Sequence, residues 1–412
     1  MSISRYWKDR KIEIVILIYI LTFLLLGFSM QSFNELIDGL TKIFTTPSVL
    51  ITDFAEVGGL GPTFVNAGLV ALIGYILLVA NKVEFRGLSI TAIFSLLGFS
   101  LMGKTVWSVL PIMLGVYIYS KLTKREFVTN IYPALFGTAL SPIVTQVTFG
   151  FGWGFLGGTV VGILIGLVIA PVSNHTLTFH EGYNLYNFGF AAGLIGLFIM
   201  NIFRAYGFDI DLPTVWGTAY NTYLRNFSII LFLSMIIVGM LISRKNLKNY
   251  LKILKEPGIT VTDYVDVAGF GSTLINMGLV GLVGVVFILL VDGDFNGPTV
   301  NGLLGMAGFA AFGKHPLNTA PIMVGVWLAS LFSVYDTNAP GTVLAGLFGT
   351  TLAPLAGHFG PLVGILAGMA HLYIVSIIGF AHGGIDLYNN GFSGGFVASF
   401  FIAIVKGIKD EY

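Results

Sequence analysis

Two lysines lie in matching apolar surroundings. Residues 98–115 read GFSLMGKTVWSVLPIMLG and residues 308–325 read GFAAFGKHPLNTAPIMVG, so Lys104 and Lys314 each follow a glycine between two apolar runs. Such a Gly-Lys step predicts that one short helix ends and a second begins, at Thr105 or at His315. The free N–H groups of the second helix would then lie beside the lysine ammonium. The pattern predicts two positions that favour a carboxylate, a phosphate or a small inorganic anion.

The lysines have a second explanation that involves no ligand. Basic side chains of membrane proteins often extend to the headgroup region, or pair with a carboxylate for structural reasons. In that case Lys104 would face outside and Lys314 inside. The sequence leaves both explanations open.

Acidic and amide residues are repeated in the same way. The acids precede the matching stretches GGLGPTFVN and AGFGSTLIN; they are Asp53, Glu56, Asp263 and Asp266. They predict an ion or proton site or counter-ions for the lysines, although helix capping explains them equally well. Asn66 and Asn276 lie deeper in the same apolar stretches, where a buried amide needs hydrogen-bond partners. They would line a path or join neighbouring helices.

A third repeated motif reads H-x-G-x-[ND]-L-Y-N-x-G-F. Its polar residues are His180, Asn184, Tyr186 and Asn187, and in the second copy His382, Asp386, Tyr388 and Asn389. This strip could line a pore or bind a ligand, or it could form a packed interface between the two halves. No second His or acid stands at ligand spacing, so we expect no metal. His358 and His371 have no repeat partner.

These motifs belong to an internal duplication. Residues 53–122 and 263–332 align without gaps at an offset of 210, with 23 of 70 positions identical. The match resumes at LFGTALSP (135–142) against LFGTTLAP (347–354), and at 180–193 against 382–395. We predict an N-terminal half, 1–210, and a C-terminal half, 211–412, that together form one unit.

Composition places both halves in a membrane. Apolar residues make up 55% of the chain and charged residues 10%, against about 25% charged in a soluble domain. Two apolar segments in each half are short, near 88–102, 105–120, 298–312 and 316–333. Fifteen residues reach about 22 Å, which is less than a hydrocarbon core of about 30 Å. Each pair is therefore a candidate re-entrant helical hairpin, and two full crossings are the alternative. We predict an all-α integral membrane protein with about five transmembrane helices and one such hairpin per repeat, roughly 10–14 spans in all.

Each half would cross the membrane an odd number of times, so the halves should be inverted relative to each other. With the N-terminus inside, 16 of the 21 basic residues fall on inside segments, and only Lys42, Arg204 and Arg225 fall outside. The positive-inside rule then predicts an inner (cytoplasmic) membrane protein with both termini cytoplasmic. The apolar run after RYWKDRK is read as a retained first helix.

Several classes of function are disfavoured. The chain has no cysteine and a net charge of +1, which gives no thiol chemistry and no reason to expect nucleic acid. No Gly-x-Ser-x-Gly, P-loop or HExxH pattern occurs, so we expect neither an enzyme nor a cofactor. The expected partners are a small solute or ion and the lipid bilayer, and a homo-oligomer is left open.

The repeated motifs carry two resemblances. Over nearly its whole length the chain resembles an internally duplicated bacterial family of multi-spanning membrane proteins of unknown function, best represented in Firmicutes. More weakly, GGLGPTFVNAGLVALIG, AGFGSTLINMGLVGLVG and NLYNFGFAAGLIG are similar to elements of urea transporters. That likeness implies two inverted halves of five crossings. It does not carry over the urea-binding residues, because Ala67 and Met277 follow the asparagines where those transporters have proline.

Together the motifs predict a transporter or channel for a small polar solute, with an anion as one version, bound at a midplane site between inverted repeats. A channel for a neutral amide and a scaffold or sensor without flux are the alternatives. The predicted solute-binding residues are Lys104, Lys314, Asn66, Asn276, Thr105, His315, Tyr186, Tyr388, Asn187 and Asn389. The predicted ion- or proton-coupling residues are Asp53, Glu56, Asp263, Asp266, His180 and His382.

Overall fold

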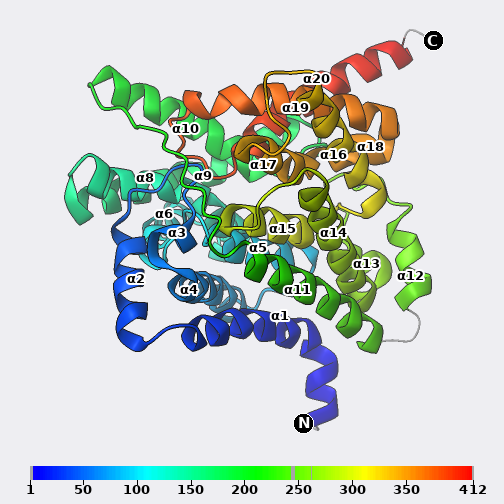
Figure 1. Cartoon of the computed structure of the whole chain (residues 1–412), viewed down its shortest axis with the longest axis horizontal. Coiled ribbons are helices and arrows are strands. Elements are labelled where there is room, and N and C mark those ends of the chain that lie inside the picture. The colour runs from blue at the N-terminus through cyan, green and yellow to red at the C-terminus, as the bar shows by residue number, and fades with distance from the viewer. Residues whose placement is uncertain (1–2, 243–245, 261, 411–412) are drawn as a thin grey trace.

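The structure is a computed structural model that describes residues 3–242, 246–260 and 262–410, and its helices pack into one body (Figure 1). Within these residues the extended backbone is limited to one isolated bridge between Thr52 and Val215. Arg244 and Lys245, counted above among the inside residues, lie outside the described residues. The side chains of Arg5, Lys8 and Lys409 are likewise not described.

The first half contains ten α-helices among the described residues. They are α1 (Ile3–Ser29), α2 (Phe33–Thr45), α3 (Phe54–Gly58), α4 (Leu60–Ala80), α5 (Gly87–Phe99), α6 (Val106–Leu122), α7 (Ile131–Phe136), α8 (Ser141–Thr145), α9 (Gly154–Phe179) and α10 (Asn187–Ala205).

The second half repeats this order. Its described helices are α11 (Asn221–Ile242), α12 (Asn246–Ile253), α13 (Tyr264–Ala268), α14 (Phe270–Leu290), α15 (Gly297–Phe309), α16 (Pro316–Leu331), α17 (Pro340–Phe348), α18 (Ala353–Phe359), α19 (Pro361–Ala381) and α20 (Asn389–Asp410).

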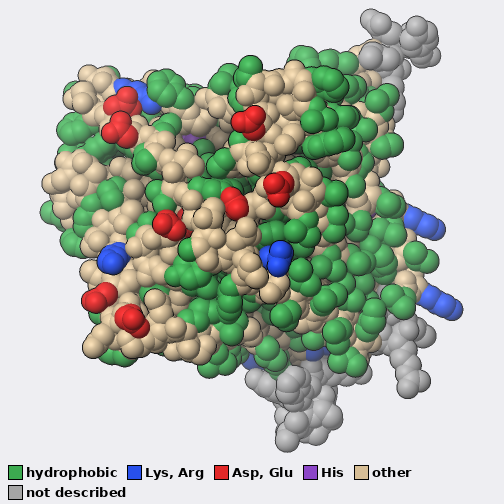
Figure 2. Space-filling view, viewed as in Figure 1, with side chains coloured by type: hydrophobic (Ala, Val, Ile, Leu, Met, Phe, Trp, Pro, Cys, Tyr) green, Lys and Arg blue, Asp and Glu red, His purple; other side chains and the backbone are tan. Residues whose placement is uncertain are grey.

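Ten spans of the described chain are long and apolar enough to cross a membrane, five in each half. This confirms the predicted all-α membrane fold. Between the second and third span of each half lie two shorter helices, α5 and α6 or α15 and α16, with 13, 17, 13 and 16 residues. The space-filling view shows a surface dominated by hydrophobic side chains with few charges (Figure 2).

One expected segment is broken. The apolar stretch 128–149 is long enough for one membrane-spanning helix, but it consists of α7, a 3-10 turn at Gly137–Leu140, α8 and a π-helical turn at Gln146–Gly150. Pro133 and Pro142 each lack an N–H group, so a regular α-helical ladder through this stretch is interrupted. The second half repeats the break with a 3-10 turn, Gly349–Leu352, between α17 and α18.

The two halves also pack internally in the same way. A Cβ atom added to Gly115 would lie 2.7 Å from the Cα of Gly166, and one added to Gly325 would lie 3.0 Å from the Cα of Gly368. The small residues thus let α6 approach α9, and α16 approach α19, at backbone distance. Gly166 and Gly368 are therefore equivalent residues of the two repeats, and equivalent residues of α9–α10 and α19–α20 differ by 202 in residue number.

The buried helices α5 and α15 lie side by side and antiparallel at the centre. Gly98 near the end of α5 lies against Asn301 near the start of α15, and Gly308 near the end of α15 lies against Phe94. The start of each helix meets the turn that follows the other, with Gly87 beside Ala311 and Gly297 beside Leu101. Repeat-equivalent elements therefore meet at the molecular centre in opposite directions.

Candidate functional site

Each repeated lysine pairs with the tyrosine of the opposite half. The Lys104 Nζ donates to the Tyr388 hydroxyl at 2.7 Å, and the Lys314 Nζ donates to the Tyr186 hydroxyl at 2.7 Å. Both lysine side chains are fully buried. The Gly-Lys step of one repeat and the His-Tyr-Asn motif of the other thus form two crossed sites between the halves, a pairing that the separate motifs do not reveal.

Aromatic rings line the path of each lysine side chain. The Lys104 Nζ lies 4.6 Å from the ring centre of Tyr388 and 5.3 Å from that of Phe99. The Lys314 Nζ lies 4.5 Å from Tyr186 and 5.4 Å from Phe309. At these distances the negative ring faces attract an ammonium ion and offset part of its loss of water.

The repeated asparagines hold the turns that carry the lysines. The Asn66 Nδ2 donates to the carbonyls of Ser100 and Lys104, both at 2.8 Å. The Asn276 Nδ2 donates to the carbonyls of Ala310 and Lys314, both at 2.7 Å. These carbonyls follow the last turn of α5 or α15, where helix acceptors lack partners. The asparagines therefore position the site; their Oδ1 atoms are buried without a partner in the described residues.

Replacing Asn66 or Asn276 by alanine is expected to destabilise the protein by about 1–3 kcal/mol, because two buried carbonyls lose their donor. The measurement is the melting temperature of the purified protein in detergent. Asn201→Ala is the control, since the exposed Asn201 amide bonds only to the Leu197 carbonyl of its own helix. Equal melting temperatures for Asn66→Ala and Asn201→Ala would contradict this role.

The two lysine sites differ in their further partners. The Lys314 Nζ also donates to Thr350 Oγ1 at 2.8 Å. At the Lys104 site the fully buried carboxyl of Asp386 accepts from the Tyr388 N–H at 2.9 Å, and its second oxygen has no hydrogen-bond partner among the described residues. The first half has Asn184 at the position of Asp386, and Asn184 is neutral and bonds to Gly391 O and Thr351 Oγ1. One site thus contains an acid and a base, and the other contains only a base.

Thr105 and His315 lie at the starts of α6 and α16, as predicted. The Thr105 Oγ1 accepts from the Ser108 N–H at 3.3 Å, and the His315 N–H donates to Asn318 Oδ1 at 2.8 Å. The His315 Nε2 contacts the Glu256 carbonyl at 3.0 Å. In this structure both residues act as caps of their helices.

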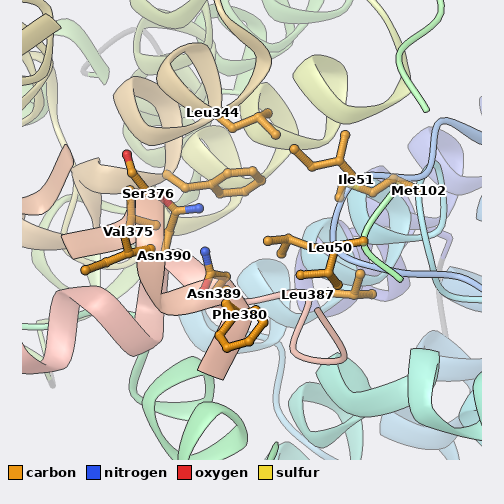
Figure 3. Close-up of a pocket in the computed structure, with 15 residues that line it drawn as sticks. Leu50, Ile51, Met102, Leu344, Val375, Ser376, Phe380, Leu387, Asn389 and Asn390 are labelled. Carbon is orange, nitrogen blue, oxygen red and sulfur yellow. The ribbon is translucent and has the colours of Figure 1, made fainter. Parts of the chain in front are cut away.

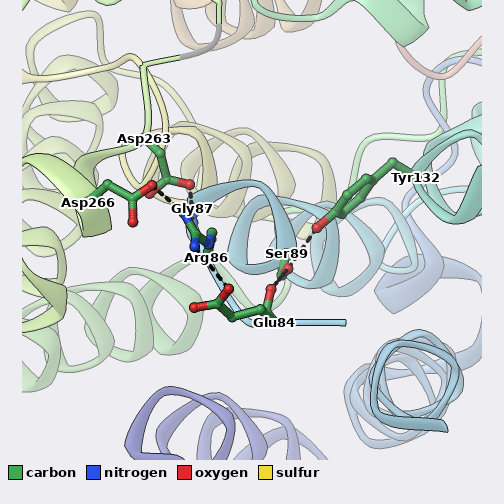
Figure 4. Close-up of polar contacts among 7 residues, drawn as sticks. All are labelled: Glu84, Arg86, Gly87, Ser89, Tyr132, Asp263 and Asp266. Carbon is green, nitrogen blue, oxygen red and sulfur yellow. Dashed lines mark hydrogen bonds and ion pairs between the residues drawn. The ribbon is translucent and has the colours of Figure 1, made fainter. Parts of the chain in front are cut away.

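Two of the repeated acids also join the halves. Asp53 and Asp263 cap α3 and α13 through the N–H groups of Ala55 and Val265. In addition, Asp263 Oδ2 accepts from the Gly87 N–H at 2.7 Å, at the start of α5 in the other half (Figure 4). The capping explanation of these acids is confirmed, with a second contact across the halves.

The other two acids lie nearer the surface. Asp266 forms an ion pair of 2.6 Å with Arg86, which also pairs with Glu84 at 2.9 Å (Figure 4). Glu56 is exposed and lies near Gly217. The four acids therefore separate into two pairs at the starts of α3 and α13, and none of them forms an ion pair with Lys104 or Lys314.

Burial raises the pKa of Asp53 to about 6, and the hydrogen bonds from Ala55, Gly217 and Gly297 offset this only in part. Folding then takes up a proton between about pH 4 and pH 6, so the melting temperature should fall as pH rises through this window. The slope is at most about 1.4 kcal/mol per pH unit. Asp53→Asn should reduce this slope, whereas Asp266→Asn should retain it; an unchanged slope in Asp53→Asn would contradict the assignment.

The repeated histidines orient the repeated asparagines. His180 Nε2 lies 3.0 Å from Asn187 Oδ1, and His382 Nε2 lies 2.7 Å from Asn389 Oδ1. The amide nitrogens then differ: Asn187 Nδ2 donates to the Ser173 carbonyl of α9 at 2.8 Å, whereas Asn389 Nδ2 has no acceptor in the part of the chain that the structure describes.

Two cavities end at these asparagines. The Asn389 cavity, of about 580 Å³, lies between α19, the start of α20 and Leu50–Ile51 (Figure 3). The Asn187 cavity, of about 170 Å³, lies between α9, the start of α10 and Thr260. Their linings are repeat-equivalent, as shown by the pairs Met102/Phe312, Phe348/Phe136, Val375/Ser173, Ser376/Asn174, Leu387/Leu185 and Asn389/Asn187. These cavities cannot be predicted from the sequence, because their apolar walls carry no distinctive residue type.

A family model, Protein of unknown function (DUF1576), matches residues 32–205 and 242–407. The chain belongs to this family. The two matched ranges correspond to the two halves, in agreement with a duplicated family. No curated protein and no solved structure matches the chain, so the weaker likeness to urea transporters stays a prediction.

Proposed function

We propose that this DUF1576 protein transports a small polar solute across its membrane by opening the Asn389 cavity and the Asn187 cavity in turn. The observation that carries the proposal is the pair of repeat-equivalent cavities, one about 580 Å³ and the other about 170 Å³. Equivalent cavities of unequal size are expected when two related halves exchange open and closed arrangements.

One aromatic cluster contacts both cavities. Phe348 lines the Asn389 cavity and stacks on Phe99 with ring centres 5.4 Å apart. Behind this pair lies Tyr388, whose ring centre is 4.3 Å from Phe99 and which lines the Asn187 cavity. The Phe99–Phe348 contact and the Lys104–Tyr388 pair thus separate the two cavities, as a barrier in a carrier would.

Antiparallel packing supports an inverted arrangement of the halves. Because α5 and α15 are repeat-equivalent and antiparallel, the two halves are inverted if these helices lie along the membrane normal. On the proposed topology α5–α6 and α15–α16 are the short helical pairs that enter from opposite sides. The Lys104 and Lys314 turns follow α5 and α15.

The distribution of charged side chains supports an assignment of the membrane side to which each cavity opens. The face that carries α2 and the segment 206–220 shows scattered acidic side chains and fewer basic ones (Figure 2). The positive-inside rule assigns such a face to the outside. Leu50 and Leu212 line the Asn389 cavity from this side, so the wide cavity would open outward and the narrow one toward the cytoplasm.

Transport itself can be tested in reconstituted liposomes. Thermal stabilisation against a panel of small anions, amides and amino acids would first identify a bound solute. Labelled solute should then enter liposomes saturably, and faster when the unlabelled solute is trapped inside, because a carrier exchanges its cavities. A bound solute that shows neither saturable uptake nor exchange would contradict transport.

A further inference from the structure

The Asn389 cavity has a polar floor inside an apolar wall. Asn389 and Asn390 are 3% and 9% exposed, and their amide nitrogens point into the cavity (Figure 3). Neither nitrogen has an acceptor among the described residues. Two buried amide donors without partners are costly unless a ligand or water accepts from them.

The orientation of Asn389 follows from its hydrogen-bond chain. The Asp386 backbone N–H donates to His382 Nδ1 at 3.4 Å, so the ring proton lies on Nε2. His382 Nε2 then donates to Asn389 Oδ1 at 2.7 Å. The carbonyl of the amide is occupied, and only its N–H donors face the cavity.

Asn390 is held in the same way by a histidine without a repeat partner. His371 is fully buried; its Nε2 lies 2.9 Å from Asn390 Oδ1, and its Nδ1 lies 3.2 Å from Ser393 Oγ. If Ser393 donates to Nδ1, Nε2 donates to Asn390. The first half has Phe188 at the position of Asn390, so the doubled donor floor belongs to the second half alone.

The other lining residues are mostly apolar and would contact an apolar part of the ligand. The walls include Leu50, Leu212, Leu344 and Phe380, and the cavity volume of about 580 Å³ lies within the usual range of small-molecule sites. Ser376 adds little polarity, because its hydroxyl donates to the Leu372 carbonyl at 2.7 Å and points away from both amides (Figure 3).

Charge beyond the floor favours an anionic head. Tyr388, the neighbour of Asn389, accepts from the Lys104 ammonium, and Lys314 lies in the equivalent site on Tyr186. Neither lysine lines the cavity itself, and the buried acid Asp386 offsets one of the two ammonium charges. Donor groups backed by net positive charge bind carboxylates more strongly than neutral acceptors.

We propose that the Asn389 cavity binds a small monocarboxylate with an apolar body, whose carboxylate oxygens accept from the amides of Asn389 and Asn390. The assignment names the substrate class of the transporter proposed above and rests on that function. The same chemistry is offered by a dissolved short-chain acid and by a fatty acid from the bilayer.

Binding can be measured on the purified chain in detergent by isothermal calorimetry. Hexanoate should bind at least tenfold more tightly than hexylammonium, with hexanamide between them. Each methylene added from butanoate to octanoate should tighten binding by roughly threefold. Hexadecanoate binding without hexanoate binding would identify the bilayer as the source of the acid.

Variants of the floor separate ligand contact from folding. Asn389→Leu and Asn390→Leu should each weaken hexanoate binding at least tenfold, whereas Asn390→Ser, which retains a donor, should lose less. Asn201→Ala, at an exposed amide outside the cavity, is the control and should bind hexanoate as the unaltered protein does. Equal binding of hexanoate and hexylammonium, or undiminished binding by both leucine variants, would overturn the assignment.

Binding in detergent and exchange in liposomes together distinguish a wrong ligand assignment from a wrong transport proposal. Hexanoate that binds in detergent but shows no exchange in liposomes keeps the ligand assignment and overturns the transporter. A different solute that exchanges while no carboxylate binds keeps the transporter and overturns the ligand.

Discussion

Replacing Lys104 or Lys314 by methionine should abolish solute uptake, with at least a hundredfold loss, while the protein still reaches the membrane. Each ammonium donates to a tyrosine of the opposite half, and the Lys104–Tyr388 pair is part of the barrier that we propose between the cavities. Methionine fills similar space but provides neither charge nor donor, so the crossed contact between the halves is lost. Uptake in liposomes is the measurement, and Lys42→Met, at an exposed lysine, is the control.

The two lysine variants should differ in stability. Tyr388 contacts Lys104 through its hydroxyl and Asp386 through its N–H, so we expect the ammonium and the buried carboxylate to balance each other across this tyrosine. Lys104→Met would then leave the carboxylate uncompensated, which costs about 3–5 kcal/mol. Lys314 has no such acid beside it, so Lys314→Met should be less destabilising. Adding Asp386→Asn should restore the melting temperature of Lys104→Met and should not restore that of Lys314→Met.

Two results with these variants would contradict the roles assigned to the lysines. Uptake that continues unchanged in both lysine variants would remove the crossed sites from the transport path. Equal destabilisation of both variants, with no rescue by Asp386→Asn, would show that Asp386 is not the counter-ion of Lys104.

Much of the fold could be predicted because membrane helices are long apolar runs and because the duplication repeats polar residues. The Gly-Lys turns, their helix starts at Thr105 and His315 and the capping acids Asp53 and Asp263 all follow from local sequence. These features depend on neighbours close in the chain, and residue type and spacing record such neighbours.

The functional arrangement depends on contacts across the halves, and sequence spacing does not record them. Lys104 contacts Tyr388 at a separation of 284 residues. Neither the Gly-Lys step nor the His-Tyr-Asn motif indicates this crossed pairing. His371 has no repeat partner, so the duplication does not single it out. Its role behind Asn390 exists only in the second half, where the repeat is broken, so symmetry could not reveal it.

On the proposed mechanism, the Asn389 cavity and the Asn187 cavity open on opposite sides of the membrane and are unequally open. Val375 and Ser173 are repeat-equivalent and line one cavity each. Both tolerate cysteine by size, and the chain has no cysteine of its own, so each thiol can be followed without background. A thiosulfonate reagent with a fixed charge stays on the side to which it is added.

The most direct measurement is the rate at which such a reagent modifies Val375→Cys and Ser173→Cys in sealed vesicles, added from either side. We predict that Val375→Cys reacts at least tenfold faster and only from the outside, and that Ser173→Cys reacts slowly and only from the cytoplasmic side. Modification of both thiols from one side, or at equal rates, would contradict the account.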